Sequence, residues 1–254
     1  MTFTQKVVIV LVVAAAIIGV LYIAGKVKNS PVATTTASST PVVHSTGIPV
    51  ASMITESHNQ TDPYKSYTLA MTYPQSSTNK LSDMYTFVQS AKQQFLSDYD
   101  SLTDKEAQMF PGEASAYNFT LTTRVATSTN TVTYIIETYQ YEGGAHGDTT
   151  ETTFTYDTSG KLVTLADVFA KPYLTTVASL ARKYFDTTLG AASGLDMINS
   201  GTEATTTNFS SWYLTPSTVT FIFGEYQVAP YSAGILEFPL QKSAVESLLA
   251  PKYK

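Results

Sequence analysis

The chain has 254 residues, of which 43% are hydrophobic and 14% charged, enough for a sizeable core in one compact domain or two small, closely packed ones. It contains no cysteine, which excludes disulfides, thiolate metal sites and a lipid-modified cysteine anchor. Subtracting the three lysines of the first 28 residues from the formal net charge of −5 leaves −8 for the remainder, and this acidity argues against binding to nucleic acid.

The N-terminus carries a long apolar run. Val7 to Ala24 form 18 residues without a charge, flanked by Lys6 on one side and by Lys26 and Lys28 on the other. A membrane-spanning helix needs roughly 17 to 25 apolar residues. The apolar stretch of a cleaved secretory signal usually has about 7 to 15 and ends at a small-residue cleavage site, which this run matches poorly. We therefore predict that residues 1–28 hold an uncleaved, single-pass signal-anchor, with a cleaved signal as the alternative.

The next segment, residues 29–53, has the composition of a linker. Twelve of the twenty residues from Ser30 to Pro49 are Ser, Thr or Pro, which predicts a disordered, exposed tether. Because nearly all of the chain follows the apolar run, we expect the globular part to lie outside the cell membrane. His44 and His58 lie in or beside this segment, and no role is assigned to them.

The folded region is expected to begin near Ile54. Ser66 to Tyr73 alternates between apolar and polar residues, which is typical of a half-buried strand. Leu81 to Asp98 has apolar residues at helical spacing and predicts an amphipathic helix. Tyr117 to Val125 alternates again and predicts a second strand. Residues 54–126 are assigned to a first subdomain and residues 127–254 to a second one packed with it.

The second subdomain is expected to continue the strands and then add helices. A hairpin of two strands is predicted first, at Thr131–Tyr141 and Thr149–Tyr156. A short helix at Leu165–Phe169 and a longer helix after Pro172 follow. Gly190 to Asn208 shows little periodicity and predicts a mobile loop.

The last part of the chain returns to strands. Three strands are predicted, at Phe209–Leu214, Thr218–Phe223 and Ile235–Leu240, and Lys242–Leu249 is expected to form a closing helix. Trp212, the only tryptophan, alternates with Leu214 and is expected in the core. The fold class is therefore α+β: a predominantly antiparallel sheet with two main helices and a C-terminal helix packed on it, preceded by the transmembrane helix.

The turn inside the predicted hairpin is the most distinctive stretch of the chain. It reads Tyr141-Glu142-Gly143-Gly144-Ala145-His146-Gly147-Asp148. Glycine supplies the positive φ angles that tight hairpin turns require. The simplest interpretation is a structural turn whose imidazole satisfies nearby backbone groups or packs on Tyr139 or Tyr141. The alternative is that His146 contacts a ligand or a partner.

Catalytic patterns are missing around this histidine. His146 is the only histidine assigned to the folded part, and the sequence has neither a Gly-x-Ser-x-Gly elbow nor a His-Glu-x-x-His motif. Carboxylate pairs for glycoside chemistry could be chosen at will, so they carry no information. We therefore predict no catalytic residues, no metal site and no cofactor.

A second loop and several shorter stretches carry a resemblance together with this turn. They are Tyr141–Gly147, Phe154–Asp157 with Gly160-Lys161, Leu165–Phe169, Trp212–Leu214, Phe221–Phe223 and Glu225–Gly234. In this order they resemble a family of bacterial extracytoplasmic domains of unknown function, and residues 54–126 resemble the companion domain that precedes it.

Paired domains of this kind form the outer half of the lysozyme-sensing anti-sigma-V factor and precede the catalytic domain of PdaC-type peptidoglycan deacetylases. The resemblance implies an α+β ectodomain at the bacterial cell envelope. We expect neither activity here, because the five residues before Lys6 leave no room for a sigma-binding segment and the stretch after Leu249 is too short for a deacetylase.

The leading hypothesis is a membrane-anchored, non-enzymatic extracytoplasmic domain that binds or senses a cell-wall glycan or a cationic envelope protein, such as a lysozyme-like protein. The alternatives are an envelope-polymer hydrolase or transferase that uses His146, and a structural assembly module. The residues expected to contact the ligand or partner are Tyr141, Glu142, His146, Asp148, Tyr226 and Tyr231. The residues expected to shape the two loops are Gly143, Gly144, Gly147, Pro230 and Gly234.

Overall fold

The computed structural model describes residues 34–37, 51–75, 81–109, 116–190 and 195–254. All of them belong to one compact unit, Ala33–Lys254. The predicted signal-anchor lies outside the described residues. Within the described part of the chain, no helix has both the length and the hydropathy that a membrane crossing requires.

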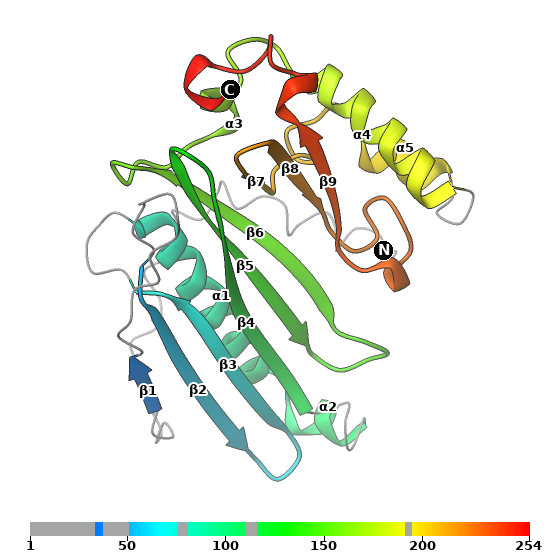
Figure 1. Cartoon of the computed structure of the whole chain (residues 1–254). Helices are drawn as coiled ribbons and strands as arrows, with labels where there is room; N and C mark the ends of the chain where they lie inside the picture. The colour runs from blue at the N-terminus through cyan, green and yellow to red at the C-terminus, as the bar shows by residue number, and fades with distance from the viewer. Residues whose placement is uncertain (1–33, 38–50, 76–80, 110–115, 191–194) are drawn as a thin grey trace. The chain divides into compact units, whose positions relative to one another are not determined.

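A six-stranded sheet organises the first two thirds of this unit (Figure 1). Its strands pair in sequence order: β1 (Thr34–Ala37), β2 (Met53–Thr61), β3 (Ser66–Pro74), β4 (Ala116–Thr127), β5 (Thr131–Tyr141) and β6 (Asp148–Asp157). All neighbours are antiparallel except β3 and β4, which are parallel. Two parallel strands need a crossover connection, and here it contains α1 (Ser82–Ser101) and α2 (Asp104–Met109).

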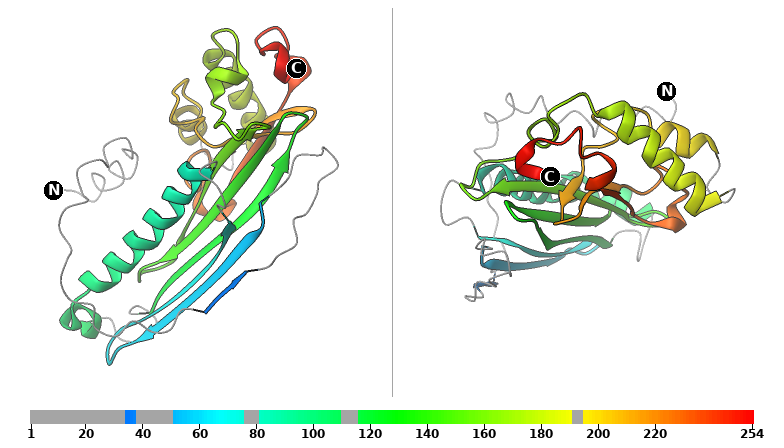
Figure 2. Two further views of the ribbon diagram at one scale, coloured as in Figure 1. Left: turned by 90° about the vertical axis from the view of Figure 1, so that its left-hand side faces the viewer. Right: turned by 45° about the horizontal axis from the view of Figure 1, so that its top comes forward.

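Helix α1 covers one face of this sheet (Figure 2), and the sequence patterns explain why. The apolar residues of β3 recur at every second position and therefore share one face. They are buried against the apolar stripe of α1, and the two sets are Tyr67, Leu69, Met71 and Tyr73 on the strand and Met84, Val88, Phe95 and Tyr99 on the helix. The predicted strand and helix are thus confirmed, with the helix three residues longer at its C-terminal end.

A smaller antiparallel sheet and a second set of helices complete the fold. The sheet contains β7 (Trp212–Leu214), β8 (Thr218–Phe223) and β9 (Leu236–Gln241), in that order. The helices are α3 (Leu165–Val168), α4 (Leu174–Leu189) and α5 (Leu195–Gly201), with short 3-10 turns at Tyr231–Ala233, Lys242–Ala244 and Pro251–Tyr253. Trp212 is buried in this second core, as predicted. The α+β class and the two main helices, α1 and α4, are confirmed.

The buried apolar residues form two clusters. One lies between α1 and the large sheet and includes residues as far along the chain as Tyr156. The other begins at Val163 and gathers α4, the small sheet and the C-terminal turns. The buried apolar residues of β5 and β6 therefore belong to the same hydrophobic cluster as those of β3 and α1. The subdomain boundary assigned between residues 126 and 127 stays a prediction.

The linker and the late loop contain structure that the composition did not indicate. Residues Thr34–Ala37, inside the predicted tether, pair with β2 as an antiparallel edge strand. Residues Leu195–Gly201, inside the predicted mobile loop, form α5, whose Ile198 is buried in the second core. Ser/Thr-rich and small-residue segments have little periodicity of their own, so these two elements depend on tertiary pairing.

The predicted closing helix at Lys242–Leu249 is wrong. Only Lys242–Ala244 forms a 3-10 turn. The backbone after it pairs with the end of α3 instead: Ala170 N–H donates to Leu248 O at 2.9 Å, and Ala250 N–H donates to Val168 O at 2.8 Å. These groups are therefore not available for hydrogen bonds along a helix axis.

A polar cluster lies under α1, where none was predicted. Glu56, 8% exposed, accepts hydrogen bonds from Lys92 of α1, from Tyr73 at 3.2 Å and from His58 at 2.6 Å. Burial acts to raise the pKa of Glu56, but the bonds from these three neighbours outweigh it and hold that pKa below its ordinary value. His58 therefore has a structural role after all.

Arg124 joins the two sheets on the face opposite α1. Its guanidinium donates to Glu151 of β6 at 3.2 and 2.9 Å and to Glu237 of β9 at 2.6 Å. The hydroxyl of Tyr213 also donates to Glu237, at 2.8 Å. This network fixes the small sheet against the large one, and with it the loop that follows β8.

Candidate functional site

The two loops singled out in the sequence meet in space. His146, in the β5–β6 turn, stacks on Tyr231 of the β8–β9 connection with ring centroids 4.0 Å apart. Tyr226, from the same connection, lies 5.6 Å from Tyr231 and 6.4 Å from His146 by the same measure. These three residues are called the aromatic cluster below. It joins side chains about 80 residues apart in the sequence.

Backbone contacts hold the loops together beneath the rings. The Tyr231 hydroxyl donates to Gly147 O at 2.9 Å, and the Thr149 N–H donates to the Glu225 carboxylate at 3.1 Å. Loss of hydration, with the nearby Glu225 charge, raises the pKa of Tyr231. The phenol therefore stays protonated around neutral pH and keeps donating to the turn.

The β5–β6 turn uses its glycines for two different reasons. Gly143 and Gly144 have φ angles of 87° and 106°, which side chains rarely adopt, and the Tyr141 hydroxyl donates to Gly144 O at 3.0 Å. Gly147 has no positive φ. A Cβ there would lie 2.6 Å from ring atoms of Tyr139, so a larger residue at this position requires the Tyr139 ring to move.

The β8–β9 connection is held by one amide side chain. Gln227 accepts from Gly224 N–H at 3.0 Å and donates to Gly201 O at 3.1 Å and to Asn208 O at 3.0 Å. Pro230 then leads into the 3-10 turn Tyr231–Ala233, which ends at Gly234 with a φ of 65°. Pro230 and Gly234 therefore flank this turn, and their loop-shaping role stays a prediction.

The hydrogen bonds of His146 define its tautomer. Its Nδ1 lies 3.0 Å from Gly147 O, a carbonyl that can only accept, so Nδ1 carries a proton. In the neutral ring Nε2 is then an acceptor, and the Tyr226 hydroxyl lies 3.4 Å from it. Asp148 Oδ1 is 4.0 Å from Nδ1, and both side chains are exposed. The imidazole is thus partly exposed to solvent and lies beside the Asp148 carboxylate.

Tyr226 has an unusual backbone. Its φ of 62° makes it the one non-glycine residue with a positive φ in the described part of the chain. Burial of the side chain does not offset the cost of this backbone conformation, because the residue is 53% exposed. A left-handed conformation costs an L-residue roughly 1 to 2 kcal/mol. The fold therefore holds an exposed aromatic ring in a strained position, a combination found at functional sites.

Replacing Tyr226 by glycine should raise the free energy of unfolding by up to about 1 kcal/mol, since relief of the strain exceeds the added flexibility of the unfolded chain. Urea denaturation measures it. Tyr64, 48% exposed and without a positive φ, is the matched control, and Tyr64→Gly should give no gain. Equal losses in both variants would contradict the strain argument.

The structure separates two of the predicted residues from the aromatic cluster. Tyr141 is engaged with its own turn through the bond to Gly144 O. Glu142 accepts a hydrogen bond from Gln140. Loss of hydration, which outweighs that bond, raises the pKa of Glu142, and the charge of Asp98 on α1 adds to the rise. The charge of Asp148 contributes to the same rise.

Glu225 was missed in the sequence among several equivalent carboxylates. Its contact with Thr149 places it next to the β5–β6 turn, and the only signal for it was its position at the start of the second loop. His146, Asp148, Tyr226 and Tyr231 are brought together as predicted residues. Their binding role stays a prediction.

The groups at the site are aromatic rings, a histidine and carboxylates. The described residues contain no group of three or more His, Asp or Glu side chains placed to hold a metal ion. The contacts described for His146 are to a carbonyl, a phenol and a carboxylate 4.0 Å away. Stacked rings with a carboxylate at the edge can bind a sugar face or a cationic side chain.

Part of this chain is similar in sequence to a known protein. Over 126 residues it is 29% identical to the peptidoglycan-N-acetylmuramic acid deacetylase PdaC of Bacillus subtilis. This alignment covers 48% of this chain and 27% of the deacetylase. The chain thus matches only about a quarter of that relative's length.

Solved structures share the fold. A DUF3298 family member from Bacteroides fragilis matches with a TM-score of 0.57 and 20% identity, over 78% of this chain and 93% of that one. A second, from Pseudomonas aeruginosa, matches with a TM-score of 0.55 and 16% identity, over 81% and 96%. The resemblance to an extracytoplasmic family of unknown function is confirmed at the level of the domain: residues 166–243 match the family described as "Protein of unknown function (DUF3298)".

Proposed function

We propose that this chain is a non-enzymatic binding module of the bacterial cell envelope, and that the aromatic cluster and its carboxylates form the binding surface. In this proposal a single N-terminal helix anchors the chain in the cell membrane and the globular part lies outside. The observation that carries the proposal is the exposed, strained Tyr226 ring beside the stacked His146 and Tyr231.

The first candidate ligand is a cell-wall glycan. Tyrosine rings present a flat apolar face with a polar edge, which suits the alternating C–H and hydroxyl groups of a sugar. Asp148 Oδ1 lies 4.0 Å from His146 Nδ1 and the Glu225 carboxylate contacts Thr149 N–H in the same turn, and both carboxylates can accept hydrogen bonds from hydroxyl groups. The curated relative is named as a deacetylase of peptidoglycan, which supports this class of polymer.

The second candidate is a cationic envelope protein, such as a lysozyme-like protein. The favouring observation is charge: residues 29–254 carry a formal charge of −8 once the first three lysines are set aside from the total of −5. The side chain of Asp148 is 77% exposed beside the cluster. An arginine or lysine of a partner could stack on the rings and pair with this carboxylate.

The proposal predicts that residues 33–254 bind insoluble peptidoglycan or lysozyme in a saturable way. Tyr231→Ala should weaken binding by about 30-fold or more, the effect of losing a hot spot worth about 2 kcal/mol. Tyr64→Ala is the control, because Tyr64 is an exposed tyrosine that belongs to neither loop. Co-sedimentation with cell-wall sacculi measures binding to peptidoglycan, and calorimetry measures binding to lysozyme.

Salt separates the two candidates. Binding to a cationic protein should weaken steeply as ionic strength rises, because exposed charges are screened beyond about 8 Å at physiological salt. Binding to a glycan through stacking and neutral hydrogen bonds should change little. Absence of binding in both arms, or an equal effect of the Tyr64 and Tyr231 variants, would remove the proposal.

A further inference from the structure

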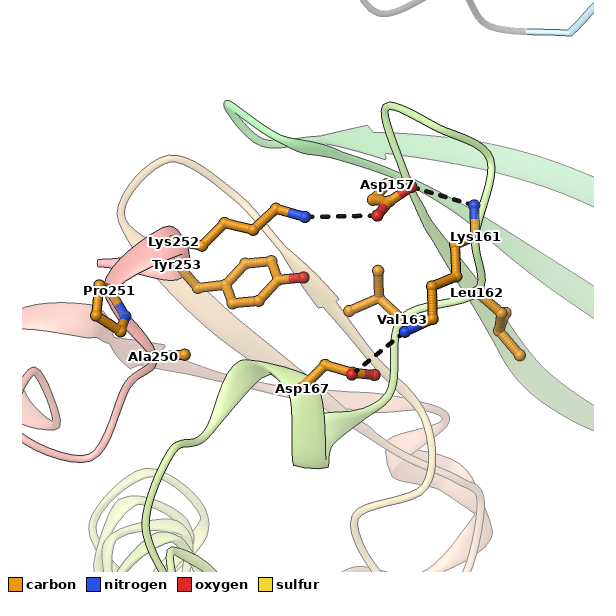
Figure 3. A pocket seen from close by; sticks show the side chains of 9 residues that line it. All are labelled: Asp157, Lys161, Leu162, Val163, Asp167, Ala250, Pro251, Lys252 and Tyr253. Carbon is orange, nitrogen blue, oxygen red and sulfur yellow. Dashed lines mark hydrogen bonds and ion pairs between the residues drawn. The ribbon is translucent and has the colours of Figure 1, made fainter.

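A pocket of about 430 Å³ lies at the opposite end of β6 from the aromatic cluster. The turn after β6, the start of α3 and the C-terminal turn line it, and it is open to solvent on one side (Figure 3). Its lining residues are Asp157, Lys161, Leu162, Val163, Asp167, Ala250, Pro251, Lys252 and Tyr253. Volumes of this size accommodate small-molecule ligands.

Two lysine–aspartate pairs face this pocket. The Nζ of Lys252 lies 3.5 Å from Asp157 Oδ2, and the Nζ of Lys161 lies 3.8 Å from Asp167 Oδ1. Both distances are long for a charge-assisted hydrogen bond, which is usually about 2.7 to 2.9 Å. The lysine side chains are also solvent-accessible, 47% exposed for Lys252 and 71% for Lys161. Each pair can therefore open at little cost, since exposed ion pairs contribute about 0 to 1 kcal/mol.

The aspartates, in contrast, are fixed. Asp157 Oδ1 accepts from the N–H groups of Ser159 at 2.9 Å and Lys161 at 3.1 Å. Asp167 Oδ2 accepts from the N–H and hydroxyl of Thr164, both at 2.8 Å, in a capping box. In each aspartate one oxygen is held by the backbone while the other faces a lysine.

Hydrogen bonding also keeps both groups ionised. The Ser159 hydroxyl and the turn amides lower the pKa of Asp157 to about 2, and the bonds from Thr164 lower the pKa of Asp167. Two permanent negative charges thus stand in fixed positions across from two adjustable positive ones.

Tyr253 and apolar side chains complete the lining. Tyr253 is only 6% exposed, and its hydroxyl points into the space between the two ion pairs (Figure 3). The Lys252 ammonium lies 5.4 Å from the centre of its ring. Leu162 and Val163 line the pocket on the side of the β6–α3 turn. The result is an apolar surface with charges of both signs at its edge.

We propose that this pocket binds a zwitterionic group, the end of an amino acid or short peptide that carries both a free ammonium and a free carboxylate. The ligand's carboxylate lies between the ammonium groups of Lys161 and Lys252, and its ammonium lies against the free oxygens of Asp157 and Asp167. The Tyr253 hydroxyl donates to the carboxylate, and small side chains contact Leu162 and Val163.

Alternating charges select against simpler ligands. A purely anionic ligand would face the fixed aspartates, and a purely cationic one would face the lysines. A zwitterion exchanges two long internal ion pairs for two new ones of better geometry. The proposal does not depend on the aromatic cluster, because the two sites lie at the two ends of a ten-residue strand that spans roughly 30 Å.

The experiment uses the full chain and three probes of nearly the same size: alanyl-alanine, its N-acetyl form without the ammonium, and its C-terminal amide without the carboxylate. NMR titration follows the amide signals of Leu162 and Val163. The free dipeptide should shift these signals in a saturable way. Each capped form should bind about tenfold more weakly or worse, the effect of losing one charge-assisted hydrogen bond.

Lys252→Met should weaken binding of the free dipeptide by a similar factor. Lys171→Met is the matched control, because Lys171 is exposed and does not line the pocket. If the N-acetyl form, which lacks the ammonium, binds as tightly as the free dipeptide, the pocket is an anion site. If the amide form, which lacks the carboxylate, binds as tightly, the pocket is a cation site. Either outcome, or no shift with any probe, overturns the proposal. His146→Ala should leave the titration unchanged, which keeps this result distinct from the binding surface proposed above.

Discussion

Replacing Arg124 by methionine should lower the free energy of unfolding by about 2 to 3 kcal/mol. The guanidinium is the partner of Glu151, whose side chain is only 6% exposed and accepts both of its bonds from Arg124. Removing the arginine leaves a carboxylate with little access to water and without its donors. The arginine itself is 43% exposed, so the penalty comes from the stranded carboxylate. Urea denaturation at neutral pH measures the loss.

Two further variants separate this penalty from a surface effect. Glu237→Gln removes the other, 38% exposed partner of Arg124 and should cost less than about 1 kcal/mol. The double variant Arg124→Met, Glu151→Met replaces the buried pair by apolar side chains and should recover most of the stability. Equal losses for Arg124→Met and Glu237→Gln would contradict the assignment.

The strands and the two long helices follow from local sequence patterns. β5 was predicted at the residues where it is found, because its β-branched and aromatic residues lie between two turn signals. β2 was not predicted, since its sequence Met53–Thr61 places Glu56 and His58 on the face that turns inward. A buried carboxylate interrupts the alternation that marks a half-buried strand, and the donors that satisfy it include Lys92, which comes from α1 and is distant in the sequence.

The site was only half visible in the sequence. Both loops stood out by their glycines and tyrosines, but their contact depends on Gln227 and on the packing of the small sheet against β6. The position of Tyr141 and Glu142 away from the aromatic cluster has a simpler cause. The prediction grouped Tyr141 and Glu142 on one surface, but adjacent residues at the end of a strand point to opposite faces, and β5 ends at Tyr141.

Replacing Lys92 by methionine should lower the free energy of unfolding by about 3 kcal/mol near neutral pH. The expected loss lies at the lower end of the range for breaking a buried ion pair, because His58 and Tyr73 still donate to Glu56. Lys183→Met, the same change on the exposed face of α4, is the control and should stay within about 0.5 kcal/mol.

The pH dependence of this loss identifies its cause. The pKa of Glu56 is lowered in the folded protein from an ordinary value of 4.5, so its stabilising contribution is complete above that value and disappears as the pH falls through the lowered one. Without Lys92, burial remains and the strongest opposing bond is gone, so the folded pKa of Glu56 rises and protonation relieves the penalty. The difference in unfolding free energy between wild type and Lys92→Met should therefore narrow from about pH 7 to about pH 3. A difference that stays constant over this range would show that the variant loses only the packing of the lysine stem, and that Glu56 does not carry its charge in the folded protein.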